Sequence, residues 1–178
     1  GHYYGFPVNV YGFSTNSHTL DAQDGFERGL NAALPALAGA DELSGIGEME
    51  AGVMGSYVQM VFDNELAYSI LRMRRGFPAD EDALAVDIIG AAMDGTRNFL
   101  GQKHTMKYLR AGEVQLTKFA ERNSWEHWER DGKRGMVERA IEETERIFRE
   151  HEVPPLEPQQ EKELDTIMAA AEKELVRK

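Results

Sequence analysis

The chain contains no cysteine, so disulfide bonds and thiolate metal ligands are excluded. A reducing, cytoplasmic compartment is the simplest expectation for such a composition. Basic residues are also scarce, because 20 lysines and arginines stand against 31 acidic residues and leave a net charge of −11. Phosphate backbones require a basic face, so we expect no nucleic-acid partner. The acidic excess is interpreted mainly as a solvated surface.

Long apolar runs are missing as well. No stretch is long enough to cross a bilayer, and no secretion signal opens the chain, so we expect no membrane partner. The first residues, GHYYGFP, read as the middle of a protein, with aromatic side chains that lead directly into a strand. We therefore expect a fragment of a longer polypeptide. Its 178 residues, 42% of them hydrophobic, suffice for one domain with a core.

Short apolar runs that end in polar residues are present instead. Residues 8–13 and 43–47 have the composition of strands, and residues 99–100 give a weaker strand signal. Parallel strands place their carboxyl ends at one edge, where barrel enzymes carry their active sites. If the three strands lie side by side, their polar tips converge on one site. The tips offer Asn16, Ser17 and His18, then Glu48 and Glu50, then Gln102, His104 and Thr105.

Helical patterns separate and follow these runs. We expect Ser17 or Thr19 to cap a first helix with an apolar face, and we expect helices at residues 57–75, 133–151 and from Pro158. Strands that alternate with helices indicate an α/β architecture with parallel pairing. The apolar face of the first helix would consist of Phe26, Leu30, Leu34 and Leu37, and that of a helix capped by Asp80 would consist of Leu84, Ile88 and Ala91.

Each candidate side chain also has a purely structural interpretation. Ser17 and Thr19 suit helix capping, while Glu48 and Glu50 could be solvated carboxylates. Asp63 is interpreted as a helix-entry residue that interacts with the helix dipole. As a metal set, the two histidines and two glutamates of the tips match no known spacing, so no metal is expected. Walker, GxSxG and GxGxxG motifs are missing too.

Five segments, in order, resemble the trimethylamine:corrinoid methyltransferase family, MttB. They are STNSHTLDAQ, LAGADELSGIGEMEAGVMGSYVQMVFDNEL, RGFPADEDALAVDII, NFLGQKHT and SWEHWERDG. The resemblance implies the C-terminal portion of a TIM (β/α)8 barrel at residues 1–120 and a helical C-terminal extension at residues 121–178. It also implies transfer of a methyl group from a methylated amine to the cobalt of a partner corrinoid protein, as in methanogenesis and other one-carbon metabolism, with no cofactor bound directly.

Trimethylamine enzymes of this family carry pyrrolysine at the barrel mouth, which the resemblance places near Asn16 to His18. Only standard residues stand there, as in relatives that resemble glycine betaine demethylases. We therefore expect a quaternary amine such as glycine betaine as the substrate. The implied catalytic residues are Asn16, His18, Glu48 and His104, and the implied substrate-binding residues are Tyr11, Phe13, Glu50, Tyr57 and Gln102; no residue is assigned to a metal.

Three alternatives remain open at this point. The chain could belong to a trimethylamine methyltransferase, or it could be a non-catalytic domain that binds an amine or a corrinoid protein. An unrelated barrel lyase or hydrolase is disfavoured by the linked motifs. Because a partial barrel leaves strand edges unpaired, we also expect the chain to form a homo-oligomer.

Overall fold

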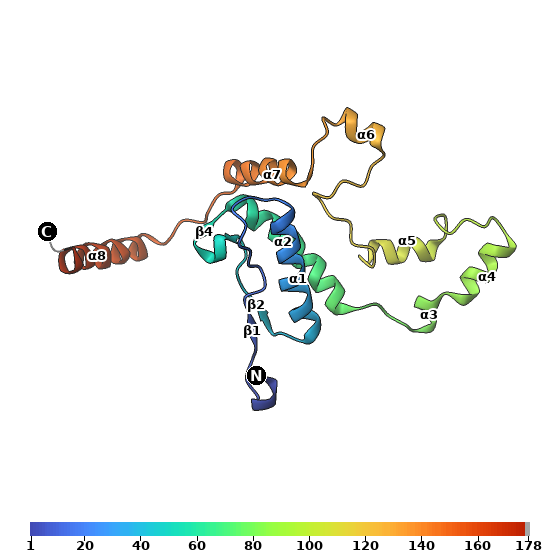
Figure 1. Ribbon diagram of the computed structural model, residues 1–178, viewed down its shortest axis with the longest axis horizontal. Helices are drawn as coiled ribbons and strands as arrows, with labels where there is room; N and C mark the ends of the chain where they lie inside the picture. The colour runs from blue at the N-terminus through green and yellow to red at the C-terminus, as the bar shows by residue number, and fades with distance from the viewer. Residues whose placement is uncertain (177–178) are drawn as a thin grey trace. The chain divides into compact units, whose positions relative to one another are not determined.

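The computed structural model describes residues 1–176. They form two compact units, the first ending at Glu145 and the second beginning at Arg146. The first unit carries the strands and most of the helices, and the second carries the last helix (Figure 1). The elements in order are η1 (His2–Tyr4), β1 (Asn9–Val10), α1 (Ala22–Ala38), β2 (Glu42–Leu43), β3 (Glu48–Met49), η2 (Glu50–Gly52), β4 (Met54–Gly55), α2 (Tyr57–Arg75), α3 (Glu81–Leu84), α4 (Val86–Asp94), α5 (Lys103–Arg110), α6 (Trp125–Arg130), α7 (Met136–Glu150) and α8 (Pro158–Leu175).

The first two predicted strands pair in parallel, as expected. Asn9 of β1 lies opposite Glu42 of β2, and Val10 lies opposite Leu43. Helix α1 connects the two strands, so this part of the chain is a β/α/β unit. Both strands are shorter than predicted. The following segment, residues 48–55, forms a small antiparallel hairpin in which β3 pairs with β4.

The third predicted strand is wrong. Residues 99–100 form a turn, and α5 begins at Lys103, directly after Gln102. Two apolar residues are too short a signal to separate a strand from a turn before a helix. Among the described residues the fold is a helix-rich, partial α/β arrangement, and the TIM barrel remains a prediction, as does the domain boundary after residue 120.

Helix boundaries follow local capping chemistry. Ser56 accepts a hydrogen bond from the Gln59 amide at the start of α2, and this helix spans the predicted residues 57–75. The cap of α1 differs from the prediction. The carboxylate of Asp21 accepts the Asp24 amide at 3.0 Å, while the Ser17 hydroxyl donates to Asp21. Ser17 therefore supports the cap rather than forming it.

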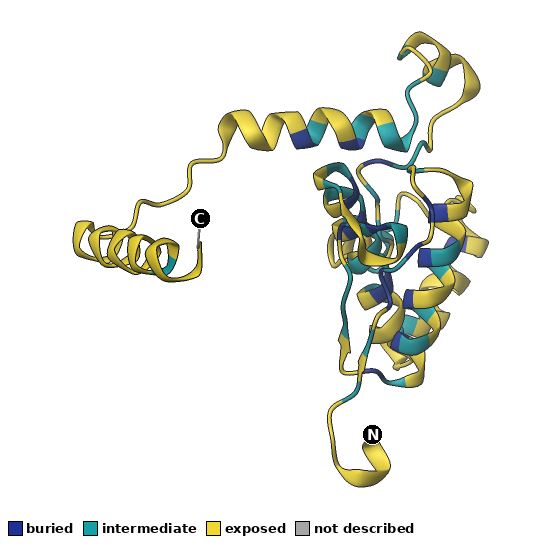
Figure 2. Cartoon of the chain, turned by 60° about the vertical axis from the view of Figure 1, so that its left-hand side comes forward, coloured by how far each residue is buried: buried dark blue, intermediate teal, exposed yellow. Residues whose placement is uncertain are grey.

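The buried face of α1 is not the apolar stripe that the sequence predicts. The buried side chains are Asp24, Arg28, Ala32 and Ala36, whereas Phe26, Leu30, Leu34 and Leu37 are exposed. Figure 2 shows narrow buried patches on helices that are otherwise exposed. Small alanines allow α1 to lie close beside α2, and the core forms between them from Phe13, Ala32, Ala36 and Ile70. The wider leucine and phenylalanine stripe is left on the surface.

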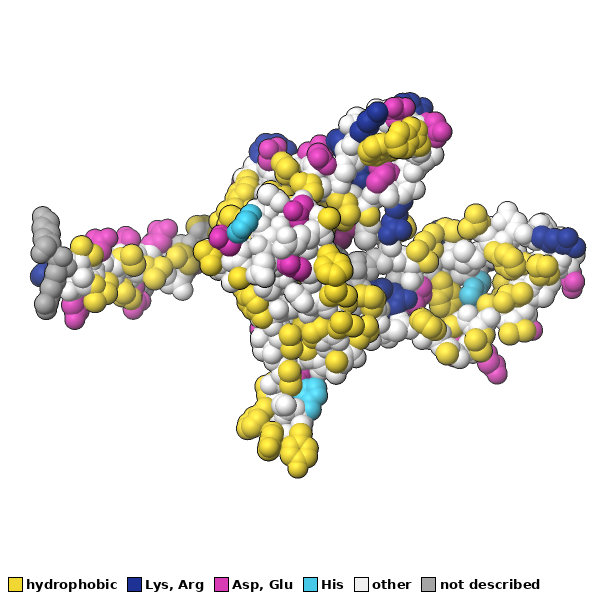
Figure 3. All heavy atoms as spheres, viewed as in Figure 1, with side chains coloured by type: hydrophobic (Ala, Val, Ile, Leu, Met, Phe, Trp, Pro, Cys, Tyr) yellow, Lys and Arg dark blue, Asp and Glu magenta, His cyan; other side chains and the backbone are white. Residues whose placement is uncertain are grey.

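Apolar side chains are exposed in other parts of the first unit as well. The predicted inward residues Leu84, Ile88 and Ala91 are exposed, because the short helices α3 and α4 have little packed against them. Figure 3 shows hydrophobic side chains over much of the visible surface. From Gly1 to Val176, no helix combines the length and the apolar character that crossing a membrane requires.

Candidate functional site

The first two predicted polar tips meet in the structure. The Glu50 amide donates to the Ser17 carbonyl at 3.2 Å, and the Ala51 amide donates to the Thr15 carbonyl at 2.8 Å. These bonds join residues 14–19, after β1, to residues 48–52, after β2. We call these two segments the loop pair. Because each follows one strand of a parallel pair, their contact is the convergence that the sequence predicts.

His18 and Glu50 face each other at the solvent-exposed side of the loop pair. His18 Nδ1 lies 4.0 Å from Glu50 Oε1, and the two side chains are 72% and 46% exposed. At this exposure and distance the pair adds little stability. Both groups are therefore open to a ligand or a partner.

Glu48 and Tyr11 both lie close to Gly52, which leaves no room for a side chain there. A Cβ atom added to Gly52 would lie 2.7 Å from Tyr11 Oη and 3.3 Å from Glu48 Oε2. Among the described residues, Glu48 Oε2 is buried and has no hydrogen-bond partner. An unpaired buried carboxylate oxygen is costly, and it marks this position as a candidate for a bound water, ion or ligand. The pair combines an acidic oxygen with an aromatic ring, the two features that bind organic cations.

The backbone of the second segment is unusual. Glu50 and Ala51 adopt φ values of 51° and 52°, and Gly52 follows with a φ of 86°. Left-handed conformations of residues other than glycine cost on the order of 1 kcal/mol each, and they gather at functional sites. The hydrogen bonds from the Glu50 and Ala51 amides to the loop after β1 hold this conformation.

Asn16 is placed through its backbone. Its amide and the Thr15 hydroxyl both donate to Glu27 Oε2, each at 2.7 Å. The hydrogen bond from Thr15, followed by that from the Asn16 amide, holds the pKa of the Glu27 carboxyl below its ordinary value. Glu27 thus anchors the first segment of the loop pair to α1, a role that the sequence did not indicate. The Asn16 side chain is exposed.

A buried polar cluster lies beneath the loop pair. Arg28 is fully buried and donates from Nε to Asp24 at 2.6 Å and from Nη1 to Asp63 at 2.7 Å. Asp63 is fully buried in α2 and also accepts the Gly47 amide and the Gln59 side chain, each at 2.8 Å. The interpretation of Asp63 as a helix-dipole residue is therefore wrong. Only the spacing of Asp24 and Arg28, four residues apart on one helix, gave a signal for this cluster.

Burial raises the pKa of the Asp63 carboxyl to about 6. The Gly47 amide and Arg28 oppose this effect, but Asp24 adds to it because two acidic groups share one guanidinium. The cluster consequently changes its charge in the mildly acidic range.

Three predicted residues lie at or beyond the margin of this site. Phe13 is only 2% exposed and packs in the core, so its ring is not available on the surface. Tyr57 begins α2 and is 66% exposed. Gln102 precedes α5 rather than following a strand, and the structure does not bring it to the loop pair.

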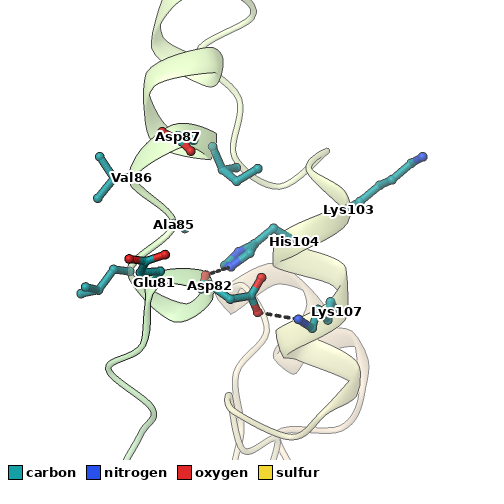
Figure 4. Close-up of a pocket in the computed structure, with 10 residues that line it drawn as sticks. Glu81, Asp82, Ala85, Val86, Asp87, Lys103, His104 and Lys107 are labelled. Carbon is teal, nitrogen blue, oxygen red and sulfur yellow. Dashed lines mark hydrogen bonds and ion pairs between the residues drawn. The ribbon is translucent and has the colours of Figure 1, made fainter.

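His104 belongs to a different pocket. It lies on α5 and its Nε2 is 2.6 Å from the Asp82 carbonyl of α3 (Figure 4). The Asp82 carboxylate binds Lys107 and Tyr108, which lowers its pKa. This pocket of about 920 Å³ is open, and Lys103 extends away from His104 in Figure 4. The predicted convergence of three tips therefore holds for two of them, because the third tip follows a turn and not a strand.

Metal binding has no support in the part of the chain that the structure describes. No group of three or more histidine, aspartate or glutamate side chains is arranged there to hold an ion. The loop pair instead offers the half-buried carboxylate of Glu48, the exposed carboxylate of Glu50 and the imidazole of His18, and Tyr11 lies next to it.

Comparison with known proteins shows which family the chain belongs to. Residues 1–176 match the family described as trimethylamine methyltransferase (MTTB). The trimethylamine methyltransferase MttB of Methanosarcina barkeri is 30% identical over 171 residues, which are 96% of this chain and 34% of the relative. MttB of Desulfitobacterium hafniense is 35% identical over 155 residues, 86% of this chain and 30% of the relative. A glycine betaine methyltransferase of Desulfitobacterium hafniense is 29% identical over 174 residues, 97% of this chain and 36% of the relative.

The chain thus spans about a third of the length of these curated relatives. The match nevertheless covers both segments of the loop pair, the helices around them and the C-terminal helices. The chain belongs to the trimethylamine methyltransferase (MTTB) family.

Proposed function

We propose that the complete protein in which this chain occurs transfers a methyl group from a quaternary amine, of the glycine betaine class, to the cobalt of a partner corrinoid protein. The family match supports methyl transfer from a methylated amine, and the glycine betaine methyltransferase among the relatives supports the quaternary substrate. The observation that carries the proposal is the unpartnered carboxylate oxygen of Glu48, which lies near Gly52 together with the hydroxyl end of Tyr11.

The chemistry suits this pair of side chains. A quaternary ammonium is already charged, so a neutral tertiary amine leaves with the electron pair of the broken C–N bond. The reaction then needs no proton donor, only a site that holds the cation and presents one methyl group. A reduced corrinoid, when the partner protein supplies it, is the nucleophile that accepts this methyl group.

Different side chains of the chain bind different parts of the substrate. Glu48 attracts the ammonium group electrostatically, and Tyr11 contacts its methyl groups with an aromatic face. Fixing the cation in line for attack contributes much of the rate enhancement in reactions of this kind. His18, which is exposed at the rim, is placed to bind the carboxylate of a betaine. Glu50, whose carboxylate lies 4.0 Å from the His18 ring, provides a second negative charge for the cation.

The test is methyl transfer to cob(I)alamin by the complete protein, followed by the change in the corrinoid absorption spectrum. We expect transfer from glycine betaine and none from trimethylamine. Transfer from trimethylamine alone would contradict the proposed substrate and identify the complete protein as a trimethylamine methyltransferase. Binding of glycine betaine without methylation of the cobalt would identify a non-catalytic binding domain and contradict the proposal.

A further inference from the structure

We propose that Arg28 is a positioning residue for the amine site, and that it acts by fixing the backbone of both segments that carry the site. This inference rests on the proposed function, because it concerns the placement of the Glu48 carboxylate. Arg28 itself is fully buried and lies beneath the loop pair, so it does not touch a substrate.

The contacts of Arg28 reach both segments directly. Its Nη1 donates to the Phe13 carbonyl at 2.6 Å, immediately before the first segment. Its Nη2 donates to the carbonyl of Glu48, the first residue of the second segment. One rigid guanidinium therefore sets the separation between the backbones of Phe13 and Glu48, at the start of the two segments. A displacement of the Glu48 backbone moves its carboxylate relative to Tyr11.

Two carboxylates hold the guanidinium in place from opposite helices. Asp24 binds Nε from the preceding turn of α1, and Asp63 binds Nη1 from α2. Asp63 also accepts the Gly47 amide, one residue before Glu48. The chain is thus tied to the cluster at Gly47 and Glu48, two consecutive residues at the start of the second segment.

This arrangement requires an arginine. The guanidinium makes four contacts with four different groups, and its planar fork of five N–H donors fits them together. Lysine keeps the charge but offers three donors at a single point, so it cannot bridge the two carbonyls in the same way.

Stability alone does not explain the cluster. Buried ion pairs commonly contribute no more stability than apolar side chains of the same volume, since desolvation offsets their attraction. The Gln59 Oε1 atom in the same cluster is buried and, among residues 1–176, has no hydrogen-bond partner. The Arg28 donors that are not used by the carboxylates bind the carbonyls of Phe13 and Glu48. The cost of the cluster is therefore explained by the geometry that it imposes on these two backbone positions.

Arg28→Lys in the complete protein tests the proposal, with Arg139→Lys as the matched control. Arg139 is also largely buried and also bridges a carbonyl and a carboxylate, those of Phe119 and Glu121, away from the loop pair. We expect Arg28→Lys to raise the KM for the amine about tenfold or more, because small displacements of a binding group have effects of this size. The KM for the corrinoid and the kinetics of Arg139→Lys should stay unchanged.

Amide hydrogen exchange supplies a readout that does not depend on activity. We expect the Gly47 and Ala51 amides to lose protection about tenfold or more in Arg28→Lys but not in Arg139→Lys. If the wild-type protein transfers no methyl group, the proposed function fails while this measurement still decides the positioning role. Wild-type protection of both amides in Arg28→Lys would overturn the inference.

A milder variant keeps the test available if Arg28→Lys does not fold. Asp24→Asn retains the shape and an acceptor oxygen for Arg28 Nε but removes one charge that holds it. We expect a smaller rise in the KM for the amine, about threefold, together with faster exchange of the Gly47 amide. A fall in stability with unchanged KM and unchanged exchange would overturn the inference.

Discussion

Arg28 of α1 and Asp63 of α2 face each other across the interior of the first unit, with 2.7 Å between Nη1 and Oδ2 and no exposure of either side chain. This ion pair joins α1 to α2, and its two members also bind the backbone of Phe13 and Gly47. It is also the point at which the structure departs furthest from the apolar core that the sequence predicts.

Asp63→Asn is expected to change how stability depends on pH. In the folded chain the pKa of Asp63 is raised from 3.8 to about 6, so the folded state binds the proton more tightly than the unfolded state between these values. The free energy of unfolding therefore falls as the pH rises through this window, by at most about 1.4 kcal/mol per pH unit from this group. The contribution is level above pH 6.

Urea unfolding of the wild type and of Asp63→Asn, at several pH values from about 4 to about 7, measures this effect. This range covers the ordinary and the raised pKa of Asp63, 3.8 and about 6. The difference between the two proteins should change across the window. Asp82→Asn serves as a control, because hydrogen bonds from Lys107 and Tyr108 lower the pKa of Asp82. A constant difference between the wild type and Asp63→Asn would show that the Asp63 pKa is not raised.

Glu121→Gln is expected to act at lower pH and with the opposite sign. The hydrogen bond from Arg139 lowers the pKa of Glu121 from 4.5 to about 2. Its stabilising effect is therefore present above pH 4.5 and is lost as the pH falls toward 2. The Tm of Glu121→Gln should lie below that of the wild type at neutral pH and approach it in acid. Glu129→Gln, which breaks an exposed pair with Lys133, should change the Tm little; equal losses in both variants would contradict the prediction.

Gly52→Ala is expected to disturb the site, whereas Gly55→Ala is not. Gly52 has a φ of 86°, and a Cβ there would meet Tyr11 Oη at 2.7 Å, so alanine adds strain of about 1 kcal/mol or more and displaces the ring. Gly55 has no atom within 4 Å of the equivalent position. Calorimetric titration with glycine betaine compares the two variants. Equal affinities would remove Tyr11 and Gly52 from the amine site.

Glu48→Gln is expected to weaken binding of a quaternary amine about tenfold, or about 1.4 kcal/mol, because it removes the charge that faces the cation. Glu42→Gln is the control, since it removes the same charge from an exposed residue of β2. The measurement is the KM in the cob(I)alamin assay or the Kd by titration. A similar change in both variants would indicate a general effect of net charge rather than a contact by Glu48.

The exposed stripe on α1 is expected to make the 178-residue chain self-associate. Leu30 and Leu34 are 47% and 63% exposed on this stripe, and exposed apolar patches of this kind mark interaction surfaces. Light scattering over a range of concentrations should show particles larger than a monomer. The double change of Leu30 and Leu34 to Glu should reduce association, whereas Val153→Glu, between α7 and α8, should not. A wild-type chain that is monomeric at all concentrations would contradict the prediction.

Local features of the sequence determined the ends of the elements. Ser56 and Gly76 bound α2 because a hydroxyl cap and a glycine act through their immediate neighbours. The parallel pairing of β1 and β2 also followed from a strand, helix and strand pattern. The family was evident from linked motifs, and the meeting of the first two polar tips followed from the parallel pairing.

Only the tertiary structure decided which face of α1 is buried and where the third tip lies. Helical periodicity shows that Phe26 and Leu30 share a stripe, but which stripe packs inward depends on the partner that lies beside it. Here α2 brings Asp63 opposite Arg28, and a buried ion cluster takes the place of the apolar stripe. His104 lies elsewhere because it follows a turn instead of a strand. Contacts between residues far apart in sequence set these positions, and helical periodicity alone does not encode such contacts.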